Sequence, residues 1–153
     1  MEIIGSKMTK KVVFLDMDGV MADFEGAVSN IIPDPPEMFV PGFFRNLKVM
    51  PGAHFAVAQI LKMSHLEVYI GSKPTTGNLH SSIEKYQWVA VNFPMLLKKI
   101  VLVCNKALLR GDVLVDDDKD RWEKKFVGTF IHFDKNNPEE SWKNVVKQLS
   151  ELK

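Results

Sequence analysis

The sequence predicts an α/β fold: a three-layer, doubly wound, mostly parallel sheet of five strands with a small cap insertion after the first strand. Short apolar runs of strand length alternate with amphipathic helical patterns along the 153 residues, which is typical of a parallel sheet with helices on both faces. The first run, residues 12–15, stops at Asp16 and Asp18, followed by Gly19. Ligands bind at this end of parallel strands, although Asp-x-Asp-Gly alone fits an ordinary turn equally well.

Each element has its own local signal. Strands are predicted at residues 12–15, 66–70, 100–103, 113–115 and 129–133, and helices at residues 21–30, 52–63, 81–93 and 137–152. Ser81 and Glu84 have the spacing of a capping box, and Asn137 before Pro138 favours the start of the last helix. Five prolines between residues 33 and 51 predict an irregular excursion from the sheet. The side chains expected to face the core from the second helix are Phe55, Ala56, Ile60 and Met63.

Length and composition indicate one soluble globular domain. With 46% hydrophobic and 25% charged residues, the chain can bury a core without disulfides. The formal net charge of +1 argues against general nucleic-acid binding, and the short apolar runs argue against a membrane span. A cytoplasmic location is expected. Cys104, the only cysteine, follows an apolar run and is predicted to be buried and inert.

Polar side chains follow three more predicted strands as they follow the first. The residues are Ser72 and Lys73 after the second strand, Lys106 after the third, and Asp116, Asp117 and Asp118 after the fourth. Because the carboxyl ends of parallel strands share one edge, we expect these side chains to converge. Each has an ordinary interpretation as a turn hydroxyl, a solvated lysine or a helix cap, but four similar strand ends favour a shared site.

Carboxylates crowded at one strand edge need cations. Each pair among Asp16, Asp18, Asp116 and Asp117 repels by roughly 3 kcal/mol at about 5 Å and an effective dielectric near 20. Lys106 supplies one positive charge, and an all-oxygen set of Asp side chains, a backbone carbonyl and waters suits Mg²⁺. A single cysteine and four histidines without paired spacing argue against zinc.

The order Asp16-Met17-Asp18-Gly19-Val20, then Ser72, Lys106 and Asp116-Asp117, resembles the four motifs of the haloacid dehalogenase superfamily of phosphotransferases. Within that superfamily, residues 16–25, 50–53, 84–89 and 114–117 are similar to the 5′(3′)-deoxyribonucleotidases. The resemblance implies a Rossmannoid phosphomonoesterase that acts on deoxyribonucleoside monophosphates with Mg²⁺ as cofactor. The small-molecule phosphomonoester is the expected partner.

The resemblance also implies roles for individual residues. Asp16 would be the nucleophile that forms an aspartyl-phosphate, and Asp18 would act as acid and then as base. Ser72 would hold phosphate oxygens, while Lys106 would neutralise charge between nucleophile and phosphate. The expected Mg²⁺ ligands are Asp16, the backbone carbonyl of Asp18, Asp117, and Asp116 either directly or from the next shell.

Two departures from the family pattern concern the substrate. Lys73 stands where these nucleotidases carry a small hydroxyl residue, and it either contacts phosphate or points to solvent. The cap insertion is shortened, so the nucleobase pocket is only partly recoverable. Phe24 and Phe44 are the predicted substrate-binding aromatics, with packing inside the cap as the alternative use of such side chains.

Residues 1–153 are interpreted as one phosphatase domain, with a core of residues 11–24 and 51–153 and a reduced cap insertion of residues 25–50. Residues 1–10 are interpreted as a tag remnant or a frayed terminus. Two alternatives stay open: the same mechanism on a sugar phosphate or a nucleic-acid terminal phosphate, and a phosphorylatable receiver-type signalling domain. The receiver is disfavoured because its phosphoacceptor lies on a middle strand, where this chain has Ser72.

Overall fold

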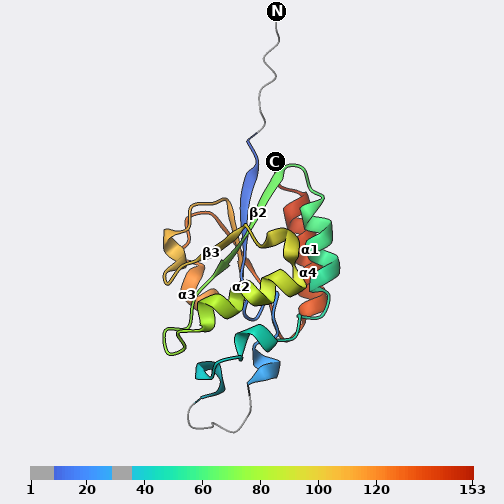
Figure 1. Cartoon of the computed structure of the whole chain (residues 1–153). Coiled ribbons are helices and arrows are strands. Elements are labelled where there is room, and N and C mark those ends of the chain that lie inside the picture. Colours follow the sequence, from blue (N-terminus) through green and yellow to red (C-terminus); the bar gives the residue numbers. More distant parts are fainter. Residues whose placement is uncertain (1–8, 29–35) are drawn as a thin grey trace, which may run out of the picture.

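A parallel sheet lies at the centre of the protein. The computed structural model describes residues 9–28 and 36–153, and these contain five strands. The strands are β1 (Lys11–Leu15), β2 (Leu66–Ser72), β3 (Ile100–Leu102), β4 (Val113–Asp116) and β5 (Thr129–His132). All neighbours pair in parallel, in the order β3-β2-β1-β4-β5, so the carboxyl ends of the strands share one edge, at the lower side of the sheet in Figure 1. The predicted fold class is confirmed.

Helices cover the two faces of the sheet unequally. They are α1 (Ala53–Leu61), α2 (Ser81–Asn92), α3 (Lys119–Trp122) and α4 (Pro138–Ser150), with short 3₁₀ turns η4 (Pro94–Leu96) and η5 (Lys106–Leu108) on either side of β3. The larger core packs α1, α2 and α4 against the face that carries Val13 and Leu15. The smaller core packs α3 and nearby loops against the opposite face, which carries Phe14 and Leu114. Successive strand residues alternate between these cores because strand side chains point to opposite faces.

The described part of the cap insertion contains single turns rather than helices. These are η1 (Glu25–Ala27), η2 (Glu37–Phe39) and η3 (Phe44–Asn46), and they lie beyond the carboxyl ends of the strands (Figure 1). The predicted irregular excursion is therefore found where the structure describes it. Parts of the predicted cap and of the predicted N-terminal extension fall on residues 29–35 and 1–8, which lie outside the described residues.

Polar side chains of α2 and of the loop before it hold residues 36–51, here called the cap segment. The buried carboxylate of Glu84 accepts hydrogen bonds from the backbone N–H groups of Gly42 at 2.5 Å and Phe44 at 3.1 Å. The Asn78 amide donates to two carbonyls in and beside η2. The Trp88 indole donates to a carbonyl just after η3, at 2.7 Å. The cap segment is thus tied at five backbone positions, three to α2 and two to the loop before it.

Several local predictions are wrong. The capping box at the start of α2 does not form, because the Ser81 hydroxyl bonds to the backbone of Thr75 while Glu84 binds the cap segment. Residues 21–28 contain the 3₁₀ turn η1 and irregular backbone rather than a helix, and residues 29 and 30 lie outside the described residues. Asn137 occupies the N-cap position of α4 without a side-chain capping bond.

Two predictions about burial are also wrong. Phe55 is 73% exposed, because α1 turns Ala53, Ala56, Val57 and Ile60 to the core instead. Cys104 is exposed, since it lies in the loop after β3 rather than inside the strand. Among the described residues, every helix is too short or too polar to cross a bilayer.

Replacing Glu84 with alanine is expected to destabilise the fold by about 2–4 kcal/mol, because the buried N–H groups of Gly42 and Phe44 lose their acceptor. Urea unfolding followed by circular dichroism measures this loss. Glu123→Ala is the control, because that exposed glutamate pairs with the exposed Lys119 at 3.8 Å, and its removal should cost less than about 1 kcal/mol. Equal losses in both variants would contradict a role for Glu84 in holding the cap segment.

Candidate active site

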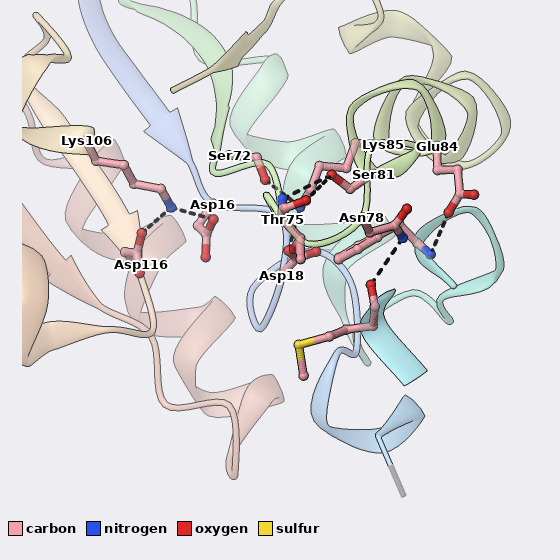
Figure 2. A network of polar contacts seen from close by, with 12 residues as sticks. Asp16, Asp18, Ser72, Thr75, Asn78, Ser81, Glu84, Lys85, Lys106 and Asp116 are labelled. Carbon is pink, nitrogen blue, oxygen red and sulfur yellow. Dashed lines mark hydrogen bonds and ion pairs between the residues drawn. The ribbon is translucent and has the colours of Figure 1, made fainter. Parts of the chain in front are cut away.

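The predicted site residues lie together at the carboxyl edge of the sheet (Figure 2). Asp16 follows β1, Ser72 ends β2, Lys106 begins the turn η5 after β3, and Asp116 ends β4. Asp16, Lys106 and Asp116 line an open cavity of about 480 Å³, and Ser72 is buried beside it. Residues separated by a hundred positions in the chain therefore meet, as the topology of parallel strands requires.

Lys106 is the buried cation at the base of the site. Its ammonium donates to Asp16 Oδ1 at 2.6 Å and to Asp116 Oδ2 at 2.5 Å. Burial alone would lower the pKa of Lys106, but attraction to the Asp16 and Asp116 carboxylates outweighs burial and raises it. Lys106 therefore stays charged throughout the accessible pH range and neutralises part of the acidic group.

Asp16, Asp116 and Asp117 form a group whose ligand oxygens all lie within 4.8 Å of one another. Burial raises the pKa of Asp16 well above its ordinary value; Lys106 opposes this shift, while the neighbouring carboxylates add to it. Burial and the charge of Asp116 also raise the pKa of Asp117. The group is short of positive charge, and its oxygen donors fit a hard divalent cation such as Mg²⁺.

Gly19 leaves room for one member of this group. Its φ is +82°, in the left-handed region that favours glycine, and a β-carbon at this position would lie 2.5 Å from Asp117 Oδ2. The glycine after the two aspartates that follow β1 therefore permits both the turn and the close approach of the Asp117 side chain.

A second buried lysine, Lys85, was missed by the sequence reasoning. It projects from α2, is fully buried, and donates to Asp18 Oδ2 at 2.5 Å and to Ser72 Oγ at 2.9 Å (Figure 2). Its ammonium also lies 4.6 Å from the ring centroid of Phe44. The available signal was helical spacing, because Lys85 shares the core-facing side of α2 with Trp88 and Val89.

The cavity walls carry some of the predicted substrate residues. Phe24 and Lys73 line the cavity. Phe44 does not line it: this ring is fully buried and packs edge to face on Phe43 within the cap segment, and its contact with substrate stays a prediction. Other lining residues that the sequence reasoning did not single out are Glu25, Thr75, Thr76, Arg121, Trp122 and Lys135.

Comparison with known proteins identifies the family. The model for the 5′ nucleotidase, deoxy (pyrimidine), cytosolic type C protein matches residues 37–148. The chain belongs to this family. A putative 5′(3′)-deoxyribonucleotidase of Staphylococcus aureus strain Mu50 is 30% identical over 90% of the chain and 94% of that protein. The cytosolic 5′(3′)-deoxyribonucleotidase of Homo sapiens is 29% identical over 69% of each chain.

The relatives also bear on the enzyme class. The mitochondrial 5′(3′)-deoxyribonucleotidase of Mus musculus is 32% identical over 71% of the chain and 64% of that protein. All three relatives are named 5′(3′)-deoxyribonucleotidases, which are phosphoric monoester hydrolases, and this confirms the predicted enzyme class and the predicted resemblance. The alignment with the S. aureus protein spans 178 positions, more than the 153 residues of this chain, so that relative has residues without a counterpart here.

The raised pKa of Asp16 gives a pH-dependent prediction for the metal-free protein. A carboxyl whose pKa is higher in the folded than in the unfolded state costs stability as pH rises from the unfolded value through the folded one. Asp16→Asn removes this cost. In EDTA, the melting temperature of Asp16→Asn should match that of the wild type near pH 4 and exceed it by several degrees at neutral pH. The exposed Asp120→Asn is the control, and a difference that does not vary with pH would contradict the prediction.

Proposed function

We propose that the protein is a Mg²⁺-dependent phosphomonoesterase that hydrolyses deoxyribonucleoside monophosphates through an aspartyl-phosphate intermediate. The observation that carries the proposal is the meeting of Asp16, Lys106 and Asp117 at the edge of a cavity, in a member of the deoxyribonucleotidase family. The names of the relatives support a nucleotide as the substrate. Family membership also argues against the receiver-type alternative.

Asp16 is the proposed nucleophile. Its position at the end of β1 places its carboxylate at the cavity, where Lys106 fixes one oxygen. As an oxygen of Asp16 forms its bond to phosphorus, the bond from phosphorus to the leaving alkoxide breaks. Water then attacks the phosphorus of the aspartyl-phosphate, the bond to Asp16 breaks, and inorganic phosphate leaves with the carboxylate regenerated.

Asp18 is the proposed acid and base. It gives a proton to the leaving alkoxide in the first step and takes one from water in the second. Lys85 holds Oδ2 of Asp18, while Oδ1 is buried without a hydrogen-bond partner among the described residues. An unpaired buried oxygen is costly unless it meets a ligand, which supports its contact with the reacting groups. Lys85 and Ser72 together would stabilise negative charge on the phosphoryl oxygens.

Asp16, Asp117 and the backbone carbonyl of Asp18 are the proposed protein ligands of Mg²⁺. Asp116 fits an outer position better, because Lys106 binds its Oδ2 and the N–H of Asp118 donates to its Oδ1. When bound, Mg²⁺ would neutralise charge on the phosphate and on the carboxylate group. The ends of β1 and β4 position these carboxylates, and Lys106 orients Asp116 by donating a hydrogen bond to it.

Phe24 is the proposed platform for the sugar or base, because it is an aromatic residue directly before the cap insertion that lines the cavity. An apolar wall near the sugar would leave a ribonucleotide 2′-hydroxyl buried without a partner, at a cost of about 1–3 kcal/mol. Lys73 is a further candidate for a phosphate contact. A sugar phosphate or a nucleic-acid terminal phosphate remains the second candidate substrate, favoured by the few cap residues on the cavity wall.

The domain scheme is part of the proposal. We take residues 11–24 and 51–153 as the core, residues 25–50 as a shortened cap, and the whole chain as one phosphatase domain. The 178-position alignment supports a shortening relative to the S. aureus protein. A cytoplasmic site of action is proposed from the human relative, which is named as the cytosolic type.

The mechanism predicts that Asp16→Asn loses nearly all turnover, because the neutral amide cannot replace the nucleophile while its shape preserves the fold. Steady-state phosphate release from a deoxyribonucleoside monophosphate with Mg²⁺, together with thermal unfolding, measures both effects. EDTA should abolish wild-type activity, and Asp117→Ala should weaken both the activity and the Mg²⁺-induced rise in melting temperature. Near-normal turnover in folded Asp16→Asn would refute the covalent mechanism, and a rate unaffected by EDTA would refute the metal assignment.

Substrate choice is tested by Phe24→Ala. The loss of kcat/KM should be about ten- to hundredfold for deoxyribonucleoside monophosphates and small for a phosphate ester without a base, because only the nucleotide needs the platform. Phe55→Ala on the exposed surface of α1 is the matched control. Equal losses on both substrates, or a sugar phosphate that outperforms every deoxynucleotide, would favour the second candidate.

A further inference from the structure

Lys135 joins the cap insertion to the carboxylate group. Its ammonium lies 2.6 Å from Oε1 of Glu25 in η1 and 3.4 Å from Oδ2 of Asp117, and its side chain lines the cavity. The residue belongs to the loop between β5 and α4. The proposed mechanism assigns it no role, although it carries the charge nearest to Asp117 from outside the buried core.

The backbone on both sides of this contact is held in place. The Ser141 hydroxyl on α4 accepts from the N–H of Asp134 and donates to its carbonyl, both at 3.0 Å. In η1, the N–H of Gly26 donates to Asp23 Oδ1 at 2.9 Å. Lys135 and Glu25 therefore extend toward each other from anchored turns, so the bridge belongs to the fold and is not a chance encounter of two long surface side chains.

The two partners of Lys135 differ in exposure. The side chain of Asp117 is 16% exposed and that of Glu25 is 60% exposed, with Lys135 between them at 34%. Water therefore screens the attraction between Lys135 and Asp117 less than it screens the attraction between Lys135 and Glu25. A divalent cation held by Asp117 would lie close to the ammonium and repel it. The ammonium can then pair with Glu25, which it already contacts.

We propose that Lys135 sets the affinity of the Asp16 and Asp117 carboxylates for their divalent cation. In the cation-free protein the Lys135 ammonium pairs with both Asp117 and Glu25. When the cation binds, the ammonium moves away from Asp117 and pairs with Glu25 alone. Lys135 is thus a positioning residue that competes with the cation, and Glu25 limits this competition. The inference rests on the proposed function as far as it requires the metal site.

Opposite effects follow for the two members of the bridge. Without Lys135, the cation meets no competing charge and should bind more tightly. Without Glu25, the ammonium keeps Asp117 as its ion-pair partner among the residues that the structure describes, and the cation should bind more weakly. Because Glu25 acts on the cation mainly through Lys135, removing Glu25 should change the affinity for the cation much less once Lys135 is absent. A lysine that only bound substrate phosphate would change none of these affinities in the absence of substrate.

Isothermal titration of the whole protein with Mg²⁺ alone, without substrate or phosphate, tests the proposal. The Kd should fall about three- to tenfold in Lys135→Met and rise by a similar factor in Glu25→Gln, as expected for partly exposed charges. Lys135→Arg keeps the charge and should restore the wild-type Kd. In the double variant, the effect of Glu25→Gln should be less than half of its effect in the wild type.

Lys143→Met is the matched control, because Lys143 is an exposed lysine of α4 paired with Glu140 at 3.6 Å, and its Kd should equal that of the wild type. An unchanged or raised Kd in Lys135→Met overturns the proposal, as does a Lys135→Arg variant that behaves like Lys135→Met. These results would leave the proposed phosphatase intact. Failure of the wild type to bind Mg²⁺ would instead overturn the metal assignment together with this inference.

Discussion

The arrangement of the site depends on how the carboxylates at the carboxyl edge of the sheet are neutralised. Asp16 and Asp116 are buried within a few ångströms of each other, and their mutual repulsion is offset by Lys106, which donates to both. Asp18 is offset in the same way by Lys85. Neither buried lysine pairs with Asp117, whose cationic neighbour Lys135 is shared with Glu25. The space between Asp16 and Asp117 is where a divalent cation and a phosphate would together complete the site.

Helix α2 couples this edge to the cap segment. Two adjacent residues act in opposite directions, since Lys85 reaches into the site while Glu84 holds backbone N–H groups of the cap segment. Phe44 links them, because Glu84 binds its backbone and its ring lies against the Lys85 ammonium. Opening the cap segment as a separate lid would break several buried hydrogen bonds, so we expect it to move with α2.

The floor and the walls of the cavity are formed by different parts of the chain. The floor consists of strand ends, which carry the acidic and basic groups of the proposed chemistry. The walls consist mostly of loops of the core, with Glu25 contributed by the described part of the cap insertion and Phe24 by the residue before it. Specificity in such a site depends on a few side chains, and the bridge between Glu25 and Lys135 lets the cap insertion act on the cation site as well as on the substrate.

The sequence by itself determined the sheet and the residues at its edge, because an apolar run and the polar residue that ends it are local signals, and parallel topology brings such ends together. The sequence alone did not indicate that Lys85, Glu84 and Lys135 take part in the site or hold the segments around it. A lysine on a core-facing helix position is stable there only beside carboxylates such as Asp18, 67 positions away in the chain. Likewise, the exposure of Cys104 and the burial of Phe44 depend on which segments pack over them. Those neighbours are fixed only when the chain folds, so long-range packing decided these features.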